Sequence, residues 1–222
     1  MIIREDAVKF TDQMGVEIHL PRPPEHIICL VPSLTELLYD LGLEQEVVGI
    51  TRYCPQPEDK HWRPVVIGGT KDFNFDQIDA LSPDLIIGSR EENYLEGISR
   101  LRERYQAWLS DVITLKDALN MITDIGSIVD KNTIADKLVR EIASEFSQLT
   151  DYPPLRIAYL IWKDPFMVAA GGTFIDEILK HGGFLNIFQL SDRYPVIDPA
   201  DLTAAEVILL SSEPYALLKM TL

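Results

Sequence analysis

The sequence has little cysteine and no long apolar run. Its 222 residues include two cysteines, Cys29 and Cys54, which lack the paired spacing of a zinc site and which we do not expect to form a disulfide. No apolar run approaches the roughly 20 residues that a membrane-spanning helix needs. Residues 1–15 lack the basic start and the apolar centre of a secretory signal. As written, the sequence predicts neither a membrane span nor export, unless a signal segment once preceded Met1.

Positive charge is also scarce. Lysine and arginine number 20 against 35 acidic residues, the formal net charge is −15, and no basic run is present. Because polyanions are bound by clustered cations, we expect no nucleic acid partner. Apolar residues make up 46% of the chain, which allows a buried core in one large domain or in two small lobes.

Catalytic and metal-binding motifs are missing as well. Gly68-Gly69-Thr70-Lys71 lacks the earlier glycine and the final hydroxyl residue of a phosphate-binding loop, and a turn is the better interpretation. Ser33 follows an apolar run without the flanking glycines of a nucleophile elbow. The four histidines have no metal-ligand spacing: His19, His26, His61 and His181. We therefore expect no catalytic residue and no metal site, and a small α/β enzyme with a cleft stays as an alternative.

What the sequence does contain is an alternation of strand and helix patterns. Residues 8–20 alternate around a Met-Gly pair and predict a hairpin. Ser33 with Glu36 predicts a capping box that opens the first helix, and Gly42 its end. Residues 26–31 form a continuous apolar run, typical of a strand buried on both faces. Further strands are predicted at 47–50, 85–88, 107–113, 156–162, 168–170 and 207–210. Helical patterns occur at 33–42, 76–81, 94–104, 115–129, 173–181 and 199–204.

One helical pattern, Asn132 to Leu149, stands out by its length. Its polar face carries Asp136, Lys137, Arg140 and Glu141, and the two prolines at 153 and 154 stop it. We expect one continuous helix, about 27 Å long, packed against the parts of the chain on both sides. Its apolar stripe consists of Ile134, Leu138, Ile142, Phe146 and Leu149.

The segments on either side of this helix resemble each other. Residues 31–42 match 171–182, and residues 84–89 match 206–211, in the same order. The fold class is therefore α/β, with two lobes of mostly parallel sheet joined by the helix. The predicted domains are 1–130, 131–150 and 151–222. Because only 12 residues follow the last predicted strand, against about 25 in the first lobe, we expect the second lobe to be incomplete.

Aromatic and cationic residues gather after the predicted strands. Ligands of parallel sheets bind outside the carboxyl ends of the strands, and two lobes would place two such edges across a cleft. Flat rings beside hydrogen-bond donors suit a large ligand with an apolar body and polar edges. The candidate ligand-binding residues are Arg52, Tyr53, Lys71, Trp162, Phe166, Arg193 and Tyr194.

Taken in order, four segments resemble the cobalamin and iron-siderophore binding proteins of ABC importers. The resemblance covers about His26 to Pro214 and is greatest to the cobalamin-type members. It implies two α/β lobes bridged by one helix, a solute bound in the cleft, no catalysis, and a periplasmic or cell-envelope location. The segments are HIICLVPSLTELLYDLG, VVGITRYCPQP, VIGGTKDFNFDQIDALSPDLII and AAGGTFIDEILKHGG.

The resemblance also implies roles for single residues. Tyr53 matches an aromatic residue that contacts the corrinoid, whereas Lys71 falls where the cobalamin binder has tryptophan. Phe166 lies near the second-lobe aromatic residue, and Tyr194 replaces a tryptophan. Asp76 matches a glutamate that docks on permease arginines.

In the second lobe, the counterpart of this docking glutamate falls at Ala200, next to Asp201. The departures at Lys71 and Tyr194 leave the ligand open among a corrinoid, which is favoured, a ferric siderophore and haem. None of these would be a covalently bound cofactor. The expected partners are permease subunits, and the expected state is a monomer. A non-exported, cytoplasmic carrier or remnant of the family is the alternative.

Overall fold

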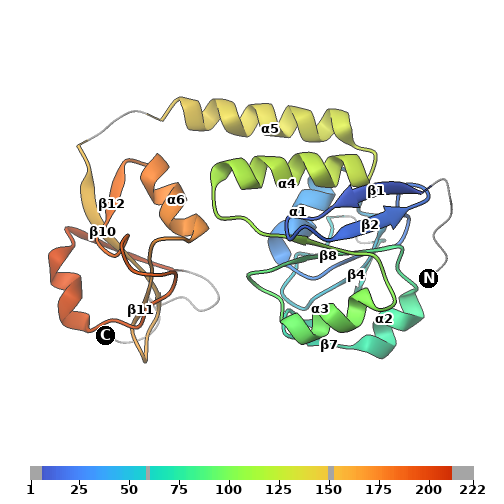
Figure 1. The fold of residues 1–222 in the computed structure, drawn as a ribbon, viewed down its shortest axis with the longest axis horizontal. Coiled ribbons are helices and arrows are strands. Elements are labelled where there is room, and N and C mark those ends of the chain that lie inside the picture. The colour runs from blue at the N-terminus through green and yellow to red at the C-terminus, as the bar shows by residue number, and fades with distance from the viewer. Residues whose placement is uncertain (1–6, 59–60, 150–152, 212–222) are drawn as a thin grey trace. The chain divides into compact units, whose positions relative to one another are not determined.

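The computed structural model describes residues 7–58, 61–149 and 153–211 (Figure 1). It divides into two units. The first consists of Met1–Asp111 and Asn120–Val139, and the second of Val112–Leu119 and Arg140–Leu222. The domain bounds expected from the sequence stay a prediction.

The predicted strands of the first unit form a parallel sheet, as expected, and Val65–Val66, which was not predicted as a strand, adds one at its edge. Its strand order is β5-β4-β3-β8-β9, and every neighbouring pair is parallel. Strands buried on both faces need apolar side chains throughout, and β3 and β9 are buried along their whole length. The strands are β3 (Ile27–Cys29), β4 (Val47–Ile50), β5 (Val65–Val66), β8 (Leu85–Ser89) and β9 (Ala107–Ser110).

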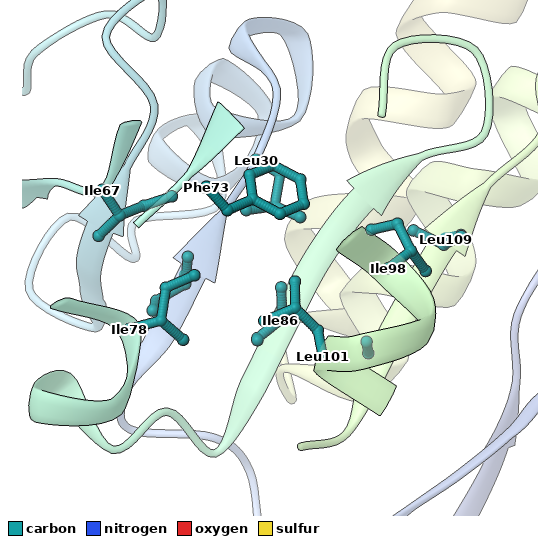
Figure 2. Close-up of a cluster of buried hydrophobic side chains, with 10 residues drawn as sticks. Leu30, Ile67, Phe73, Ile78, Ile86, Ile98, Leu101 and Leu109 are labelled. Atoms are coloured by element: carbon teal, nitrogen blue, oxygen red, sulfur yellow. The ribbon is translucent and has the colours of Figure 1, made fainter. Parts of the chain in front are cut away.

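Helices α2 (Phe75–Leu81) and α3 (Leu95–Arg102) contribute to one apolar cluster on this sheet. Figure 2 shows Ile78 of α2 and Leu101 of α3 on either side of Ile86 in β8. These three side chains are at most 1% exposed, so the cluster fixes α2 and α3 against the strands. Cys29, expected to be a buried hydrophobe, is fully buried, and Cys54 is buried as well.

The first helix, α1 (Pro32–Asp40), begins differently from the prediction. Its N-cap is Val31, whose side chain cannot cap, and no capping hydrogen bond from Ser33 is present. The prediction of a capping box at Ser33 and Glu36 is therefore wrong. Pro32 occupies the first turn, where its fixed φ suits a helix and its missing N–H is not needed. The predicted end is confirmed, because Gly42 follows the helix with φ +75°.

Two small hairpins complete the first unit. The predicted hairpin at its start is confirmed as β1 (Val8–Thr11) paired antiparallel with β2 (Glu17–Leu20). Buried Asp12 binds this hairpin to the sheet, since it accepts from the Leu109 N–H and pairs with Arg102. Of the Gly68–Lys71 segment, expected to be a turn, Thr70 and Lys71 form the turn between strands β6 (Gly68–Gly69) and β7 (Asp72–Phe73).

Two long helices follow, α4 (Leu115–Ile128) and α5 (Asn132–Ser147). The continuous helix expected from residue 132 is confirmed, two residues shorter at its end. The buried residue of α5 is Ala135, and a Cβ placed on Gly126 of α4 would lie 2.3 Å from the Ala135 Cβ. Ile134, expected to pack, is 43% exposed, so that part of the prediction is wrong.

Of the remaining residues of the stripe, Leu138, Ile142 and Phe146 are half-buried, whereas Leu149 lies beyond the end of α5 and is 51% exposed. The Phe146 ring lies 5.3 Å from the His181 ring. Both α4 and α5 contain a boundary between the two units. Of the helices in the described part of the chain, none is both long and apolar enough to span a bilayer.

The second unit is built around β10 (Leu155–Trp162). Its Ile157 pairs in parallel with Asn186 of β12 (Phe184–Asn186) on one side and with Val207 of β13 (Val207–Leu210) on the other. β11 (Met167–Ala169) pairs antiparallel with the end of β10. Helix α6 (Phe174–His181) starts at the Thr173 cap, and a 3-10 helix spans Pro199–Ala204. These elements were predicted except β12, which is a correction.

The repeat expected from the sequence is visible in the pairing. In the first unit, Ile27 of β3 pairs in parallel with Val47 on one side and Leu85 on the other. β10, α6, β12 and β13 therefore repeat the arrangement of β3, α1, β4 and β8. The outer side of β8 pairs with β9, whereas no strand of the described residues pairs with the outer side of β13.

Candidate functional site

In the first unit, the strand order reverses between β3 and β8. The chain leaves β3 toward β4 on one side, and leaves β8 toward β9 on the other. Such a switch point leaves a crevice at the carboxyl ends of the two strands, where open α/β sheets bind ligands. We call residues 51–53, 70–72 and 89–93 the first-unit rim. It holds the loops after β4 and β8 and the turn of the β6–β7 hairpin.

Arg52 and Tyr53 lie on this rim after β4. The Arg52 N–H donates to the Gly68 carbonyl at 2.8 Å, which fixes the loop beside the β6–β7 hairpin. The Arg52 guanidinium pairs with Asp72, with Nη2 to Oδ2 at 2.8 Å, and lies 5.9 Å from the Tyr53 ring centroid. Tyr53 is 61% exposed. The rim thus presents an exposed aromatic ring, while the neighbouring Arg52 is already paired with a carboxylate.

Lys71 and Glu92 come from different loops of the rim. Asn93 connects these loops, because its side chain accepts from the Ser89 N–H at 2.9 Å and donates to the Thr70 carbonyl at 3.0 Å. Lys71 is exposed and Glu92 is half-buried. Burial, and then the charge of Glu91, raise the pKa of Glu92, while Lys71 acts in the opposite direction. The sequence did not single out Glu92, although an acidic pair directly after a buried strand was a visible signal.

The second unit holds the other four predicted contacts. Trp162 ends β10 and is 36% exposed. Phe166 is half-buried and packs on Leu160 and Val168, so its ring belongs to the apolar core of this unit. Of the four, it is the one whose environment fits packing better than ligand contact.

Arg193 and Tyr194 lie together beside the turn after β11. Backbone hydrogen bonds join Arg193 to Ala170 and Gly171 at 2.7 and 2.9 Å. Its guanidinium donates to the Gly172 carbonyl at 3.3 Å and lies 5.6 Å from the Tyr194 ring. Arg52, Tyr53 and Lys71 thus form one group and Arg193 with Tyr194 another. A common cleft for the two groups stays a prediction.

Asp76, the expected docking residue, lies in the first turn of α2 and is exposed. The cap of this helix is Asn74, which accepts from the Gln77 N–H, so Asp76 is free of the capping role. Asp76 lines a surface hollow of about 650 Å³, where the Arg100 guanidinium lies 3.8 Å from the Phe75 ring centroid. Asp201 is exposed but accepts from the Asp198 N–H, in the capping box of the 3-10 helix.

The described residues contain no candidate site at which the chain itself could bind a metal ion. Residues 7–58, 61–149 and 153–211 contain no group of three or more His, Cys, Asp or Glu side chains able to hold an ion. A metal that reaches this protein inside a chelate would need none, because the chelator supplies the ligands.

The family model and two relatives that match this chain are all described as binding proteins. Residues 27–211 match the family model described as periplasmic binding protein. A vitamin B12-binding protein of Vibrio cholerae is 26% identical over 203 residues, 89% of this chain and 73% of the relative. An uncharacterised ABC transporter substrate-binding lipoprotein of Bacillus subtilis is 27% identical over 190 residues, 78% of this chain and 58% of the relative.

Solved structures share the fold. The crystal structure of the periplasmic vitamin B12-binding protein of Vibrio cholerae has a TM-score of 0.75 and 24% identity, and the match covers 86% of this chain and 77% of that one. The family match and this structural match both extend over elements of the two units.

Proposed function

Since this chain belongs to the periplasmic binding protein family, we propose that it is the solute-binding component of an ABC importer and that its solute is a metal chelate, with a corrinoid favoured. The family's members bind and deliver solutes, and we propose no catalytic step for this chain. The proposed location is the periplasm or the outer side of the cell membrane, in line with the printed descriptions of its relatives.

The choice of ligand rests on one observation: at the strand ends the aromatic rings are exposed, while the arginines already have partners. Tyr53 and Trp162 expose aromatic surface. Arg52 is paired with Asp72, and Arg193 donates to a backbone carbonyl. An anionic chelate would have to compete for these guanidinium groups, whereas a bulky neutral ligand needs the rings and leaves the pairs intact. This supports a corrinoid over a ferric siderophore of negative charge or haem with its two carboxylates.

In this proposal Tyr53, Lys71, Trp162 and Tyr194 contact the ligand, and Arg52 and Arg193 hold the loops that carry the rings. Phe166 supports the second-unit loop from the core side. Asp76 and Asp201 are the proposed contacts to permease subunits, of which Asp76 is better supported, because it is exposed and takes no part in the cap of its helix.

A binding panel tests this proposal. Isothermal titration calorimetry with cyanocobalamin, haem and a ferric tris-catecholate siderophore compares the three ligand classes at one pH and two salt concentrations. We expect cyanocobalamin to bind most tightly and with little dependence on salt, because ring contacts are not screened. Tightest binding of the siderophore, weakened by salt, would assign an anionic chelate instead. Absence of binding to all three would count against chelate import.

A further inference from the structure

The first-unit rim contains one cation, Lys71, and one half-buried carboxylate, Glu92, that take part in none of its ion pairs. Arg52 pairs with Asp72, and Arg90 with Asp111 at 2.7 Å. Within the described residues, no hydrogen bond or ion pair reaches the side chain of Lys71 or Glu92. The two charges influence each other electrostatically, and neither is neutralised by direct contact.

The positions of Lys71 and Glu92 are fixed by the backbone around them. Lys71 follows Thr70, whose carbonyl accepts from Asn93, and Glu92 precedes that same asparagine. The asparagine side chain also closes the turn after β8 through the Ser89 N–H. One residue thus joins the hairpin turn to the strand end. Lys71 and Glu92 are held as neighbours at the switch point without touching.

The surroundings of Glu92 make its charge costly without a partner. The side chain is half-buried, and Glu91 next to it carries the same charge. Behind it lies the end of β3, where Cys29 is fully buried. A partly desolvated carboxylate in this position gains from a donor that a ligand brings and is destabilised by a second negative group.

We propose that Lys71 and Glu92 form an amide-recognising subsite that selects ligands with primary amide groups over ligands with carboxylates. The inference deepens the proposed function and rests on it. An amide has one acceptor and two donors. Its carbonyl accepts from the Lys71 ammonium, and its N–H donates to the Glu92 carboxylate. A carboxylate of the same shape also meets Lys71, but it offers no donor and faces the charge of Glu92.

Two corrinoids with the same ring system provide the test. Dicyanocobinamide carries amides around the corrin, and dicyanocobyrinic acid carries carboxylates in their place. Calorimetric dissociation constants of both are measured for the unaltered chain and for Glu92→Gln, Lys71→Gln and Glu91→Gln. Glu91→Gln is the matched control, because it removes the same charge from the exposed neighbouring residue. Thermal unfolding of each variant confirms that it is folded.

The two site variants are expected to act in opposite directions. Glu92→Gln should reduce the preference for cobinamide by about tenfold, the worth of one charged contact. Lys71→Gln removes the cation that favours a carboxylate, and should therefore increase that preference. Glu91→Gln should change it much less than Glu92→Gln. Because Lys71 is exposed, its variant should fold even if Glu92→Gln does not.

Three results would overturn the subsite. The first is an unchanged preference in both site variants, the second a shift in the same direction in both, and the third an effect of Glu91→Gln as large as that of Glu92→Gln. Each leaves the proposed function standing as long as cobinamide binds the unaltered chain. If neither corrinoid binds the unaltered chain, the corrinoid assignment and the subsite fail together.

Discussion

At the residue scale, Arg52 and Tyr53 are neighbours in the chain with different surroundings. The arginine is held by Asp72 and by the Gly68 carbonyl, whereas the tyrosine ring stays 61% exposed. An exposed ring on a fixed loop loses little conformational freedom when a ligand covers it. The arrangement therefore favours contact through the ring over contact through the charge.

Tyr53 is expected to contribute directly to corrinoid binding. Tyr53→Ala should weaken cyanocobalamin binding by about 1–2 kcal/mol, as loss of a buried aromatic face suggests. Tyr53→Phe keeps the ring and should bind nearly as well as the unaltered chain. The check is calorimetry on both variants. Equal affinities for alanine and phenylalanine would remove Tyr53 from the ligand contacts.

Asp72 is expected to restrain Arg52 from binding anions. Asp72→Asn releases the guanidinium, so haem should bind more tightly to the variant, and the gain should decline as salt is added. Glu17→Gln, which releases Lys9 in the β1–β2 hairpin, is the matched control and should change nothing. The measurement is haem titration at low and high salt, and an unchanged haem affinity would mean that Arg52 lies outside the ligand contacts.

Several site residues could be predicted from the sequence, since aromatic and basic residues after apolar runs mark the ends of parallel strands. The pairing of Arg52 with Asp72 could not, because it depends on the β6–β7 hairpin, whose two-residue strands are too short to leave a periodic pattern. Glu92 was missed as well, because the half-burial of its side chain leaves no pattern in the sequence of its own segment.

At the scale of elements, the contact between α4 and α5 depends on two small residues. Gly126 leaves room for Ala135, the buried residue of α5, whereas Ile134 beside it is 43% exposed. The period of α5 predicted its length and the half-buried positions Leu138, Ile142 and Phe146. It could not predict which edge of the stripe is covered, because that is decided by a glycine on another helix.

Gly126→Ala tests this contact. The added methyl would lie 2.3 Å from the Ala135 Cβ, so the helices must separate. Overpacking of this kind costs about 1–3 kcal/mol, against a gain of about 1 kcal/mol from helix propensity. We expect a net loss in urea-induced unfolding. Ser127→Ala, at the exposed neighbouring position, is the control. A stabilised Gly126→Ala variant would contradict the close packing.

Two short features were not predicted correctly from the sequence, namely the start of α1 and strand β12. A Ser-x-x-Glu pattern usually signals a capping box, but the preceding Pro32 moves the helix start to Val31, and that proline was the available signal. β12 has three residues after a Gly-Gly pair and no alternation long enough to detect. The predicted longer strands were all found, and those of the first-unit sheet, such as β3 and β9, are buried along their whole length.

At the scale of the whole molecule, the two units contain the same arrangement of strands and helix. β13 corresponds to β8, yet Val207 and Ile208 are 38% and 44% exposed, whereas Leu85 and Ile86 are fully buried. β9 pairs with the outer side of β8, whereas no strand of the described residues pairs with the outer side of β13. Sequence comparison within the chain predicted this correspondence, since the matching segments occur in the same order in both halves.

Docking to a permease is the proposal that involves a second protein. Asp76→Ala should slow transport by reconstituted proteoliposomes while the affinity for cyanocobalamin stays the same, because neither Tyr53 nor Lys71 lines the hollow that Asp76 shares with Arg52 and Asp72. Gln77→Ala removes the neighbouring polar side chain of the same hollow and is the control. If Asp76→Ala lowers ligand affinity instead, Asp76 belongs to the ligand site.

The central claim is that this chain binds a corrinoid, and direct calorimetric titration of the purified protein with cyanocobalamin tests it most directly. The account predicts a saturable isotherm with one ligand per chain and an affinity that hardly changes between low and high salt. If the heat of injection shows no saturation, although circular dichroism shows that the protein is folded, the corrinoid assignment is contradicted.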